Sequence, residues 1–458
     1  MASSRKILGI GALFSASIGV IVSQITIVSV LQGFGLGGTG FLLAMGLAFL
    51  LAMANAMAYT ELALMMPEVT SLSSYSEAAI GNFPAILVVF AGYVVPAMFG
   101  TAGELILMNQ VLEQTLPFKT SVFFWPVILV TVFATLNILG TDVFARVQTV
   151  LSFTVLAFLI VTGVVALSGM GATPLPPGPG AGWPALSENT MTVGVVALAF
   201  WGFVGSEYVT SLVAEAKNPS RDLPLAVLGG LVLVFIAYAT FGIGSAFFVT
   251  RQGLAEGAAP HLDFAVGAYG PGARVWFSVL AILASASLLN TVLAAVPRML
   301  LGMANNGQVF PIFRQVSARY QTPVYAILFV ACMPLVGLAW SRGDASSILP
   351  LSIAASITWL LSYMLAQVSL IVLRFRYPDW NRPFRVPMFP LIPAAAIAAM
   401  AYVCLNAAPT PEMAPRIAEY TGVVLGLFTV IGALWVRFVM KKGLFEPVTP
   451  VEDTQHAA

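Results

Sequence analysis

Long apolar stretches separated by short polar segments make up most of the chain. A helix needs about 20 apolar residues to cross a lipid bilayer. Stretches close to this length or longer lie at 10–32, 40–66, 84–112, 122–139, 148–169, 191–213, 225–250, 273–301, 322–340, 348–373, 389–408 and 418–439. The pattern predicts an all-α membrane protein with twelve transmembrane helices.

The composition excludes most other classes of protein. Apolar residues make up 59% of the 458 residues and charged residues 9%, whereas a soluble domain is about 25% charged. The net charge of +1 gives no support to a nucleic-acid partner. Cysteine is limited to Cys332 and Cys404, both in apolar runs, and His261 is the one histidine outside the C-terminal tail. We therefore expect no disulfide framework, no metal site and no cofactor.

The loops predict the orientation in the membrane, because cytoplasmic loops carry an excess of lysine and arginine. With the N-terminus placed in the cytoplasm, all but five of the 20 basic residues lie on the cytoplasmic side. The five on the outer side are Lys119, Arg251, Arg274, Arg342 and Arg416. The distribution predicts a multi-pass protein of the cell membrane with both termini in the cytoplasm.

Two of the predicted spans carry residues that suit a broken helix. Span 1 has a cluster of glycine and serine between Gly9 and Gly19, and span 6 contains Trp201-Gly202-Phe203-Val204-Gly205-Ser206-Glu207. The clusters are five spans apart, which predicts an inverted repeat of five helices plus five. Paired breaks of this kind mark the substrate site in many transporters. The alternative is that the glycines only let neighbouring helices pack closely.

A broken helix offers groups for both ends of an α-amino acid. The N-terminus of the second half exposes unpaired N–H groups and the positive end of the helix dipole, which suit a carboxylate. The unwound carbonyl groups suit an ammonium group.

Two carboxylates lie inside predicted spans, where an ionisable side chain is costly and indicates a functional site. Glu207 lies near the middle of span 6, beside the suspected break. Glu104 lies in span 3, close to the helix face that carries Gly92, Pro96 and Gly100. The structural alternatives are a protonated, hydrogen-bonded carboxyl at Glu207 and a water-exposed residue of an outer vestibule at Glu104.

Three further residues are candidates. Trp201 and Phe203 flank the suspected break in span 6, where a ring can stack on a cation or cover a bound substrate. Core packing is the alternative for both rings. Glu61 lies near the cytoplasmic end of span 2, and we assign it a structural or gating role.

Longer motifs resemble one family of transporters. The segment 200–207, followed by Ala214-Glu215-Ala216-Lys217-Asn218-Pro219-Ser220-Arg221-Asp222-Leu223-Pro224, resembles the helix 6 signature of the amino acid–polyamine–organocation (APC) superfamily. Three other segments resemble the same family in the same order: Tyr59 to Leu62 at the end of helix 2, Asn305 to Pro311 after helix 8, and Leu373 to Pro387 after helix 10.

The resemblance implies a fold and a domain organisation. Broken helices 1 and 6 belong to the two inverted repeats, and two extra helices follow at the C-terminus. The implied units are a transporter core at 1–388, helices 11 and 12 at 389–440, and a disordered cytoplasmic tail at 441–458. Substrate is implied to bind between the broken helices, with alternating access to the two sides.

The resemblance also implies roles for individual residues. Trp201 falls at an aromatic gate position, and Glu207 at an acidic position of helix 6 that we assign to substrate binding and proton coupling. Some members carry a lysine in helix 5 in place of a sodium ion, but span 5 here has none. A sodium site is not supported either, because nothing in the sequence assigns a ligand role to the span 8 hydroxyls of Ser285, Ser287 and Thr291. Four residues fall where the family has its glycine-rich break in helix 1, with serines in place of glycines. The predicted substrate-binding residues are Ser15, Ala16, Ser17, Ile18, Glu104, Trp201, Phe203, Gly205 and Glu207.

We therefore predict a secondary active transporter of amino acids or organic amines, and not an enzyme. A cationic amino acid or polyamine is favoured, because Glu104 would otherwise lack a partner unless it were protonated or bound to water. A neutral amino acid permease of the same fold and a channel are the alternatives. The expected partners are a small-molecule substrate and the lipid bilayer, and no nucleic acid. Proton coupling, exchange and the oligomeric state are left open.

Overall fold

The computed structural model describes residues 6–66, 72–116, 119–170, 192–408 and 411–448. These residues form helices and connections, and Leu8 pairs with Ala216 in an isolated parallel bridge. The α-helices are α1 (Ile10–Ile18), α2 (Gln24–Gly37), α3 (Gly40–Met65), α4 (Ser73–Ala79), α5 (Asn82–Val89), α6 (Val95–Thr115), α7 (Phe124–Ile138), α8 (Thr141–Leu167), α9 (Val193–Trp201), α10 (Pro219–Ser245), α11 (Arg251–Glu256), α12 (Pro260–Tyr269), α13 (Ala273–Asn305), α14 (Val324–Trp340), α15 (Ile348–Arg376), α16 (Leu391–Leu405) and α17 (Ala414–Leu434). The 3-10 and π segments are η1 (Phe90–Val94), η3 (Ser206–Glu215), η4 (Pro311–Arg314), η5 (Ala345–Ser347) and η6 (Trp435–Met440).

Every predicted span overlaps at least one of these helical elements. Within the described ranges, 8 helical segments are long and apolar enough to cross a membrane: Gly40–Met65, Asn82–Thr115, Thr141–Leu167, Val193–Glu215, Pro219–Ser245, Ala273–Asn305, Ala345–Arg376 and Ala414–Met440. The shorter apolar helices α2, α7, α14 and α16 fall in the remaining predicted spans. The prediction of an all-helical membrane protein is confirmed, and the number of twelve crossings stays a prediction.

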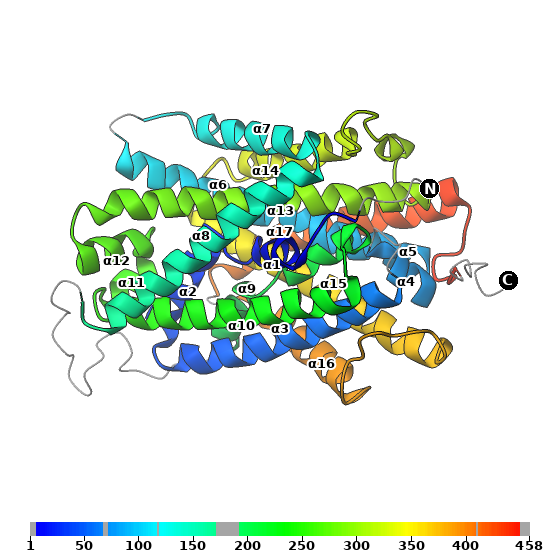
Figure 1. Cartoon of the computed structure of the whole chain (residues 1–458), viewed down its shortest axis with the longest axis horizontal. Helices are drawn as coiled ribbons and strands as arrows, with labels where there is room; N and C mark the ends of the chain where they lie inside the picture. The colour runs from blue at the N-terminus through cyan, green and yellow to red at the C-terminus, as the bar shows by residue number, and fades with distance from the viewer. Residues whose placement is uncertain (1–5, 67–71, 117–118, 171–191, 409–410, 449–458) are drawn as a thin grey trace.

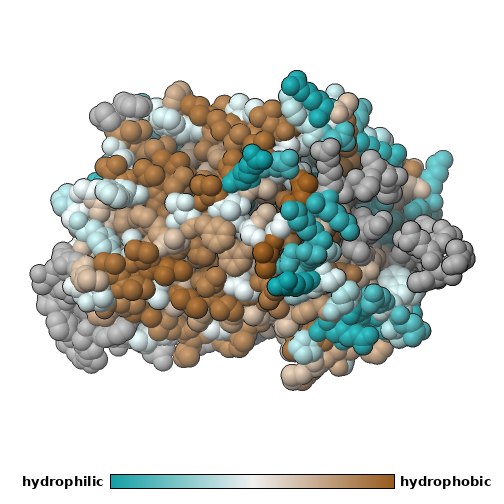
Figure 2. Space-filling model, in the orientation of Figure 1, coloured by the Kyte–Doolittle hydropathy of each residue, from teal (hydrophilic) through white to brown (hydrophobic). Residues whose placement is uncertain are grey.

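The long helices run along the longest axis of the molecule (Figure 1). The stretch that leads into α1, the helices α4 and α5, and the segment after η6 lie toward one end, and α11 and α12 lie toward the other. Figure 2 shows a broad apolar surface in the middle of this view, with hydrophilic residues gathered toward the end that carries α4 and α5. Hydropathy does not distinguish basic from acidic residues, so the predicted orientation in the membrane stays a prediction.

Helix 1 is broken one turn later than predicted. The residues 15–18 lie inside α1, and the non-helical residues are 19–23. Ser15 and Ser17 fit the helix because their hydroxyls donate to the backbone oxygens of Gly11 and Phe14, as serine in a helix often does. Ser23 then caps α2, with its side chain accepting from the N–H of Thr26. The predicted break at residues 15–18 is therefore wrong in position.

Helix 6 is broken where the sequence predicts. The helix α9 ends at Trp201, and η3 starts at Ser206. Between them, Gly205 has φ 112° and ψ −3°, a conformation that residues with a side chain rarely adopt. A Cβ atom at this position would also lie 2.7 Å from the side chain of Val20 in the other break.

The two interrupted helices lie against each other. The first half of each contacts the second half of the other: α1 packs on η3, and α2 packs on α9. This antiparallel arrangement is the one that an inverted repeat requires at its centre. The repeat as a whole, and the division into a core and two further helices, stay predictions.

Part of the predicted disordered tail packs on the helices. Leu444 O accepts a hydrogen bond from Phe83 N at the start of α5, and Val448 N donates to Glu77 O in α4. The aromatic rings of Phe445 and Phe83 also meet edge to face, 5.9 Å apart. Residues 441–448 are therefore held against α4 and α5, and residues 449–458 lie outside the described part of the chain.

Candidate functional site

A small cavity lies where the two interrupted helices meet. Residues from both breaks and from α2, α6, α9, η3, α13 and α15 line it: Val20, Thr26, Pro96, Gly100, Thr101, Trp201, Val204, Tyr208, Leu288, Val292 and Trp359. About 10 Å³ of it is open to a water molecule, which is room for about one water. The site is therefore nearly closed in this structure.

Trp201 forms one wall of this cavity. Its ring meets Trp359 edge to face, with 6.0 Å between the centroids. It also lies over Gly100, where an added Cβ atom would come within 3.0 Å of the ring. The indole nitrogen Nε1 is buried and bonds to no described residue. The ring thus borders the cavity, and its predicted gating role stays a prediction.

Glu207 is fully buried directly after the break in helix 6. Its carboxylate accepts hydrogen bonds from Trp359 Nε1 (3.0 Å) and Tyr363 OH (2.6 Å), both on α15. The Tyr363 oxygen in turn accepts from Gly205 N at 3.2 Å. Next to Glu207, the buried hydroxyl of Tyr208 bonds to no described residue. The Glu207 carboxylate therefore joins η3 to α15. The Tyr208 hydroxyl is a polar group of the cavity wall that no described residue satisfies.

Glu104 caps the start of α2. Its carboxylate accepts from the backbone N–H groups of Gln24 (2.9 Å) and Ile25 (2.7 Å) and from Ser285 Oγ on α13 (2.6 Å). The start of a helix favours a carboxylate, because its N–H groups are unpaired and its dipole end is positive. The residue is fully buried. The alternative of a water-exposed vestibule residue is therefore wrong, and so is the premise that Glu104 lacks a partner within the protein.

The remaining predicted site residues lie away from the cavity lining. Ser15, Ala16, Ser17 and Ile18 are fully buried in α1, and Ser17 Oγ also donates to Ala226 O of α10 at 3.0 Å. These four residues therefore pack α1 against its neighbours.

Phe203 belongs to an aromatic cluster beside the break. Its ring packs against Phe235 and Tyr238 of α10, each 6.2 Å away, and against Phe49 of α3 at 6.0 Å. The ring is buried and does not line the cavity. Phe203 therefore packs in the core beside the break, as the alternative to its predicted substrate-binding role stated.

Several residues that line the cavity or bond to Glu207 were not predicted from the sequence. Tyr208 directly follows Glu207, so its proximity to the site could have been inferred. Trp359 and Tyr363 are four residues apart on α15, a spacing that puts both on one helix face. Which helix that face meets depends on the packing of distant segments, so the sequence alone could not assign these two residues to Glu207.

A cluster of amide and hydroxyl groups fills the space between α1, α8 and α13. Gln148 Nε2 donates to Ser152 Oγ and Ser287 Oγ, both at 2.8 Å, and lies 3.5 Å from Ser15 O. Ser287 Oγ donates to Gly19 O at the break (3.0 Å). The neutral amide nitrogen of Gln148 therefore occupies a position surrounded by oxygen atoms, on the helix where some family members carry a lysine. Gln148 was not among the residues predicted from the sequence.

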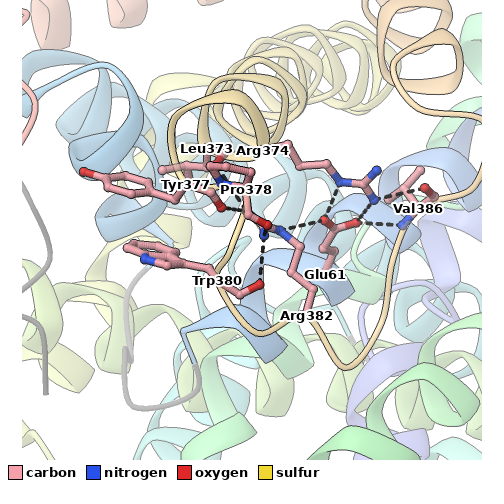
Figure 3. A network of polar contacts seen from close by, with 8 residues as sticks. All are labelled: Glu61, Leu373, Arg374, Tyr377, Pro378, Trp380, Arg382 and Val386. Atoms are coloured by element: carbon pink, nitrogen blue, oxygen red, sulfur yellow. Dashed lines mark hydrogen bonds and ion pairs between the residues drawn. The ribbon is translucent and has the colours of Figure 1, made fainter. Parts of the chain in front are cut away.

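A second polar network joins α3 to the end of α15 (Figure 3). Glu61 is fully buried and accepts from both Arg374 Nε (2.6 Å) and Arg374 Nη2, and from Val386 N (2.6 Å). Arg382 Nε lies 3.5 Å from the same carboxylate. Arg374 also lies over the ring of Phe389, 4.4 Å from its centroid. Glu61 thus holds the connection after α15 against α3, as the predicted structural role requires.

Comparison with known proteins gives the family. Residues 8–440 match a family described as amino acid permease. The chain is 24% identical over 438 residues to the branched-chain amino acid permease BcaP of Bacillus subtilis (strain 168). The aligned region covers 87% of this chain and 86% of that protein. It is 25% identical over 357 residues to the cystine/glutamate transporter of Homo sapiens, covering 75% and 68%. It is 26% identical over 272 residues to the b(0,+)-type amino acid transporter 1 of Mus musculus, covering 57% and 53%.

These relatives are permeases and transporters and not enzymes, which confirms the resemblance to the APC superfamily. The match to the family extends over nearly the whole chain and includes both broken helices. The chain belongs to the amino acid permease family.

Proposed function

We propose that this protein is a secondary active transporter that moves amino acids or organic amines by alternating access. The observation that carries the proposal is that two interrupted helices, α1–α2 and α9–η3, border one cavity. Irregular backbone inside a membrane protein is tolerated where it lines a cavity, and transporters bind their substrates at such breaks. Membership of a family whose members are named for amino acid transport supports a substrate of this size.

A cationic amino acid or polyamine is favoured by the charges around the cavity. Glu207 accepts a hydrogen bond from Trp359, a residue of the cavity wall, and none of the described residues that line the cavity is basic. The rings of Trp201, Tyr208 and Trp359 offer π faces to a cation. The predicted roles of Glu207 in substrate binding and proton coupling, and of Trp201 as a gate, are retained in this proposal.

A neutral amino acid is the second candidate. Val20, Leu288 and Val292 line the cavity with apolar side chains, which suit a branched aliphatic substrate. The relative BcaP is named for branched-chain amino acids.

Uptake of labelled substrate into proteoliposomes tests the proposal. We expect saturable uptake that is accelerated by unlabelled substrate inside the vesicles if transport occurs by exchange, or by a pH gradient if it is coupled to protons. A current proportional to voltage, without saturation, would instead indicate a channel.

The variant Glu207→Gln tests the site in the same assay. We expect a severe loss of transport with an unchanged elution profile in detergent, because the carboxylate charge is lost while the side-chain volume is kept. Glu113→Gln on the exposed part of α6 is the matched control and should keep the wild-type rate. If Glu207→Gln had a wild-type rate and pH profile, the carboxylate would have a structural role only.

A further inference from the structure

We propose that Arg298 and Glu215 form a gate that closes the transporter toward the end of the molecule that carries α4 and α5. The proposal rests on the proposed transport function, and it assigns control of access from one side to two residues outside the cavity. Arg298 lies in the last part of α13, and Glu215 is the last residue of η3.

The side chain of Arg298 joins three helical elements. Its Nε donates a hydrogen bond to Glu215 Oε1 at the end of η3 (2.9 Å), and its Nη2 donates to Thr141 Oγ1 at the start of α8 (2.6 Å). A third hydrogen bond runs from Nη1 to Ala294 O of α13 itself. The fixed fork of a guanidinium group suits several acceptors at once. Arg298 therefore ties the second half of helix 6 to α8 and α13.

The backbone of Glu215 extends this connection to the first half of helix 1. Its carbonyl oxygen accepts from Ile7 N (3.0 Å) and Leu8 N (2.9 Å), and Lys217 N donates to Leu8 O at 2.9 Å. The isolated bridge between Leu8 and Ala216 lies at the same place. The chain that leads into α1 is therefore joined to the end of η3, next to the residue that bonds to Arg298.

The Arg298–Glu215 pair lies between the cavity and the end that carries α4. On α13, Arg298 follows the cavity residue Val292 after about 9 Å of helix. Beyond it, Asn306 donates a hydrogen bond to a carboxylate of α4. On η3, the cavity residue Tyr208 lies near the start and Glu215 lies at the end. The pair is therefore placed to control access to the cavity from the α4 end.

The breaks in helices 1 and 6 give α1 and η3 freedom to move away from α8 and α13. α1 ends at Ile18 and η3 starts at Ser206, so non-helical residues separate each from the other half of its helix. A few residues of this kind can absorb the backbone changes of a hinge. Because α1 packs on α8 and η3 packs on α13, opening of the cavity toward α4 requires the bond between Glu215 and Arg298 to break.

Burial makes this ion pair sensitive to the loss of one partner. The side chains of Arg298 and Glu215 are 11% and 18% exposed, so little water can replace a lost partner in the closed arrangement. A buried charge without its partner is costly, whereas the same charge is hydrated once the helices separate. Loss of the Glu215 carboxylate therefore destabilises the closed arrangement relative to the open one.

A cysteine in the cavity reports access from each side of the membrane. The full-length protein carries Val204→Cys in a background in which Cys332 and Cys404 are replaced by serine. A membrane-impermeant maleimide is added to one side at a time, and an epitope tag identifies the side of the N-terminus. We expect Glu215→Gln to raise the labelling rate from the side of the N-terminus by about tenfold or more, with no increase from the other side.

Three variants control for this experiment. Glu256→Gln, which removes an exposed carboxylate from α11 at the opposite end, should label as the wild type does. Glu215→Gln combined with Arg298→Gln should label more slowly than Glu215→Gln alone, because the unpaired positive charge is removed as well. If Glu215→Gln does not reach the membrane, Thr141→Val, which removes the bond from Arg298 to α8, should raise the rate in the same direction.

The side of the labelling separates a gate from a structural role. An unchanged rate, or an equal increase from both sides, would overturn the gate, because general loosening of the structure has no preferred side. Such a result with substrate uptake retained leaves the transport function standing. Absence of binding and uptake for every compound with the wild-type protein would overturn the proposed function, and the gate with it.

Discussion

The network around Glu61 gives the sharpest prediction of stability. The substitution Glu61→Gln removes the negative charge that Arg374 and Arg382 share. The side chains of Arg374 and Arg382 are only 14% and 3% exposed, so water cannot replace the lost partner fully. The variant therefore leaves two positive charges close together near the C-terminal end of α15 without a carboxylate between them.

The expected cost follows from the burial of this network. Removal of one partner from a buried ion pair costs about 3–5 kcal/mol. The lower end applies here, because glutamine can still accept one hydrogen bond from Arg374, and Arg374 keeps its bond to Val386 O. An entropy of unfolding of about 2.1 cal/mol/K per residue over 458 residues converts each kcal/mol to about 1 °C. We therefore expect the melting temperature to fall by about 3 °C, or by more if helices persist in the unfolded state in detergent.

Tryptophan fluorescence of the purified protein during heating measures this shift. Glu419→Gln, which removes an exposed carboxylate from α17, is the control and should melt as the wild type does. The double variant Glu61→Gln with Arg374→Gln should lose less stability than the two single variants added together, because the two side chains act through one interaction. A Glu61→Gln protein that melts within the error of the control would refute the assignment of a stabilising role to this network.

Three further predictions concern the site. Trp201→Leu should raise the apparent Kd for substrate by about 2- to 30-fold, the range of a cation–π contact. Phe203→Leu should leave the Kd unchanged in the same binding assay. Equal effects of the two substitutions would assign both rings to packing. Gly205→Ala should destabilise the protein by about 1–3 kcal/mol, the cost of a strained backbone conformation. Gly229→Ala, where an added Cβ meets open space, is the control and should not destabilise it. Thermal unfolding of the two variants measures the difference, and similar melting temperatures would contradict the proposed strain at Gly205. Because the amide of Gln148 fills the oxygen-lined position between α1 and α13, substrate binding should be unchanged when NaCl is replaced by KCl, and a sodium-dependent Kd would contradict this reading.

The helices could be predicted from the sequence because the apolar stretches are long and are required by the bilayer itself. The break in helix 6 could also be predicted, because Gly205 adopts a backbone conformation that favours glycine and lies in a motif of recognisable composition. Both results depend on local properties of the chain. Local properties are visible in a single sequence.

The break in helix 1 was misplaced because its cause is not local. Serine is compatible with a helix when its hydroxyl bonds to its own backbone, as that of Ser15 does. The break begins at Gly19, where a Cβ atom would lie 2.3 Å from Gln148 Nε2 and 2.2 Å from Thr291 Oγ1. These two side chains come from α8 and α13, far away in the sequence. The partners of Glu104 were missed for the same reason, since its bonds to Gln24 and Ile25 depend on how α6 crosses the start of α2.

The two buried carboxylates differ in the groups that hold them. Glu104 accepts from two backbone N–H groups at the start of α2 and from Ser285, so an ammonium group there would compete with the bonds that hold α2. Glu207 accepts from the side chains of Trp359 and Tyr363 on α15, and Trp359 lines the cavity together with Tyr208, the neighbour of Glu207. The two acids thus have different tasks: Glu104 neutralises the positive end of α2, and Glu207 is the acid bonded to the cavity wall, where we expect a substrate cation to approach.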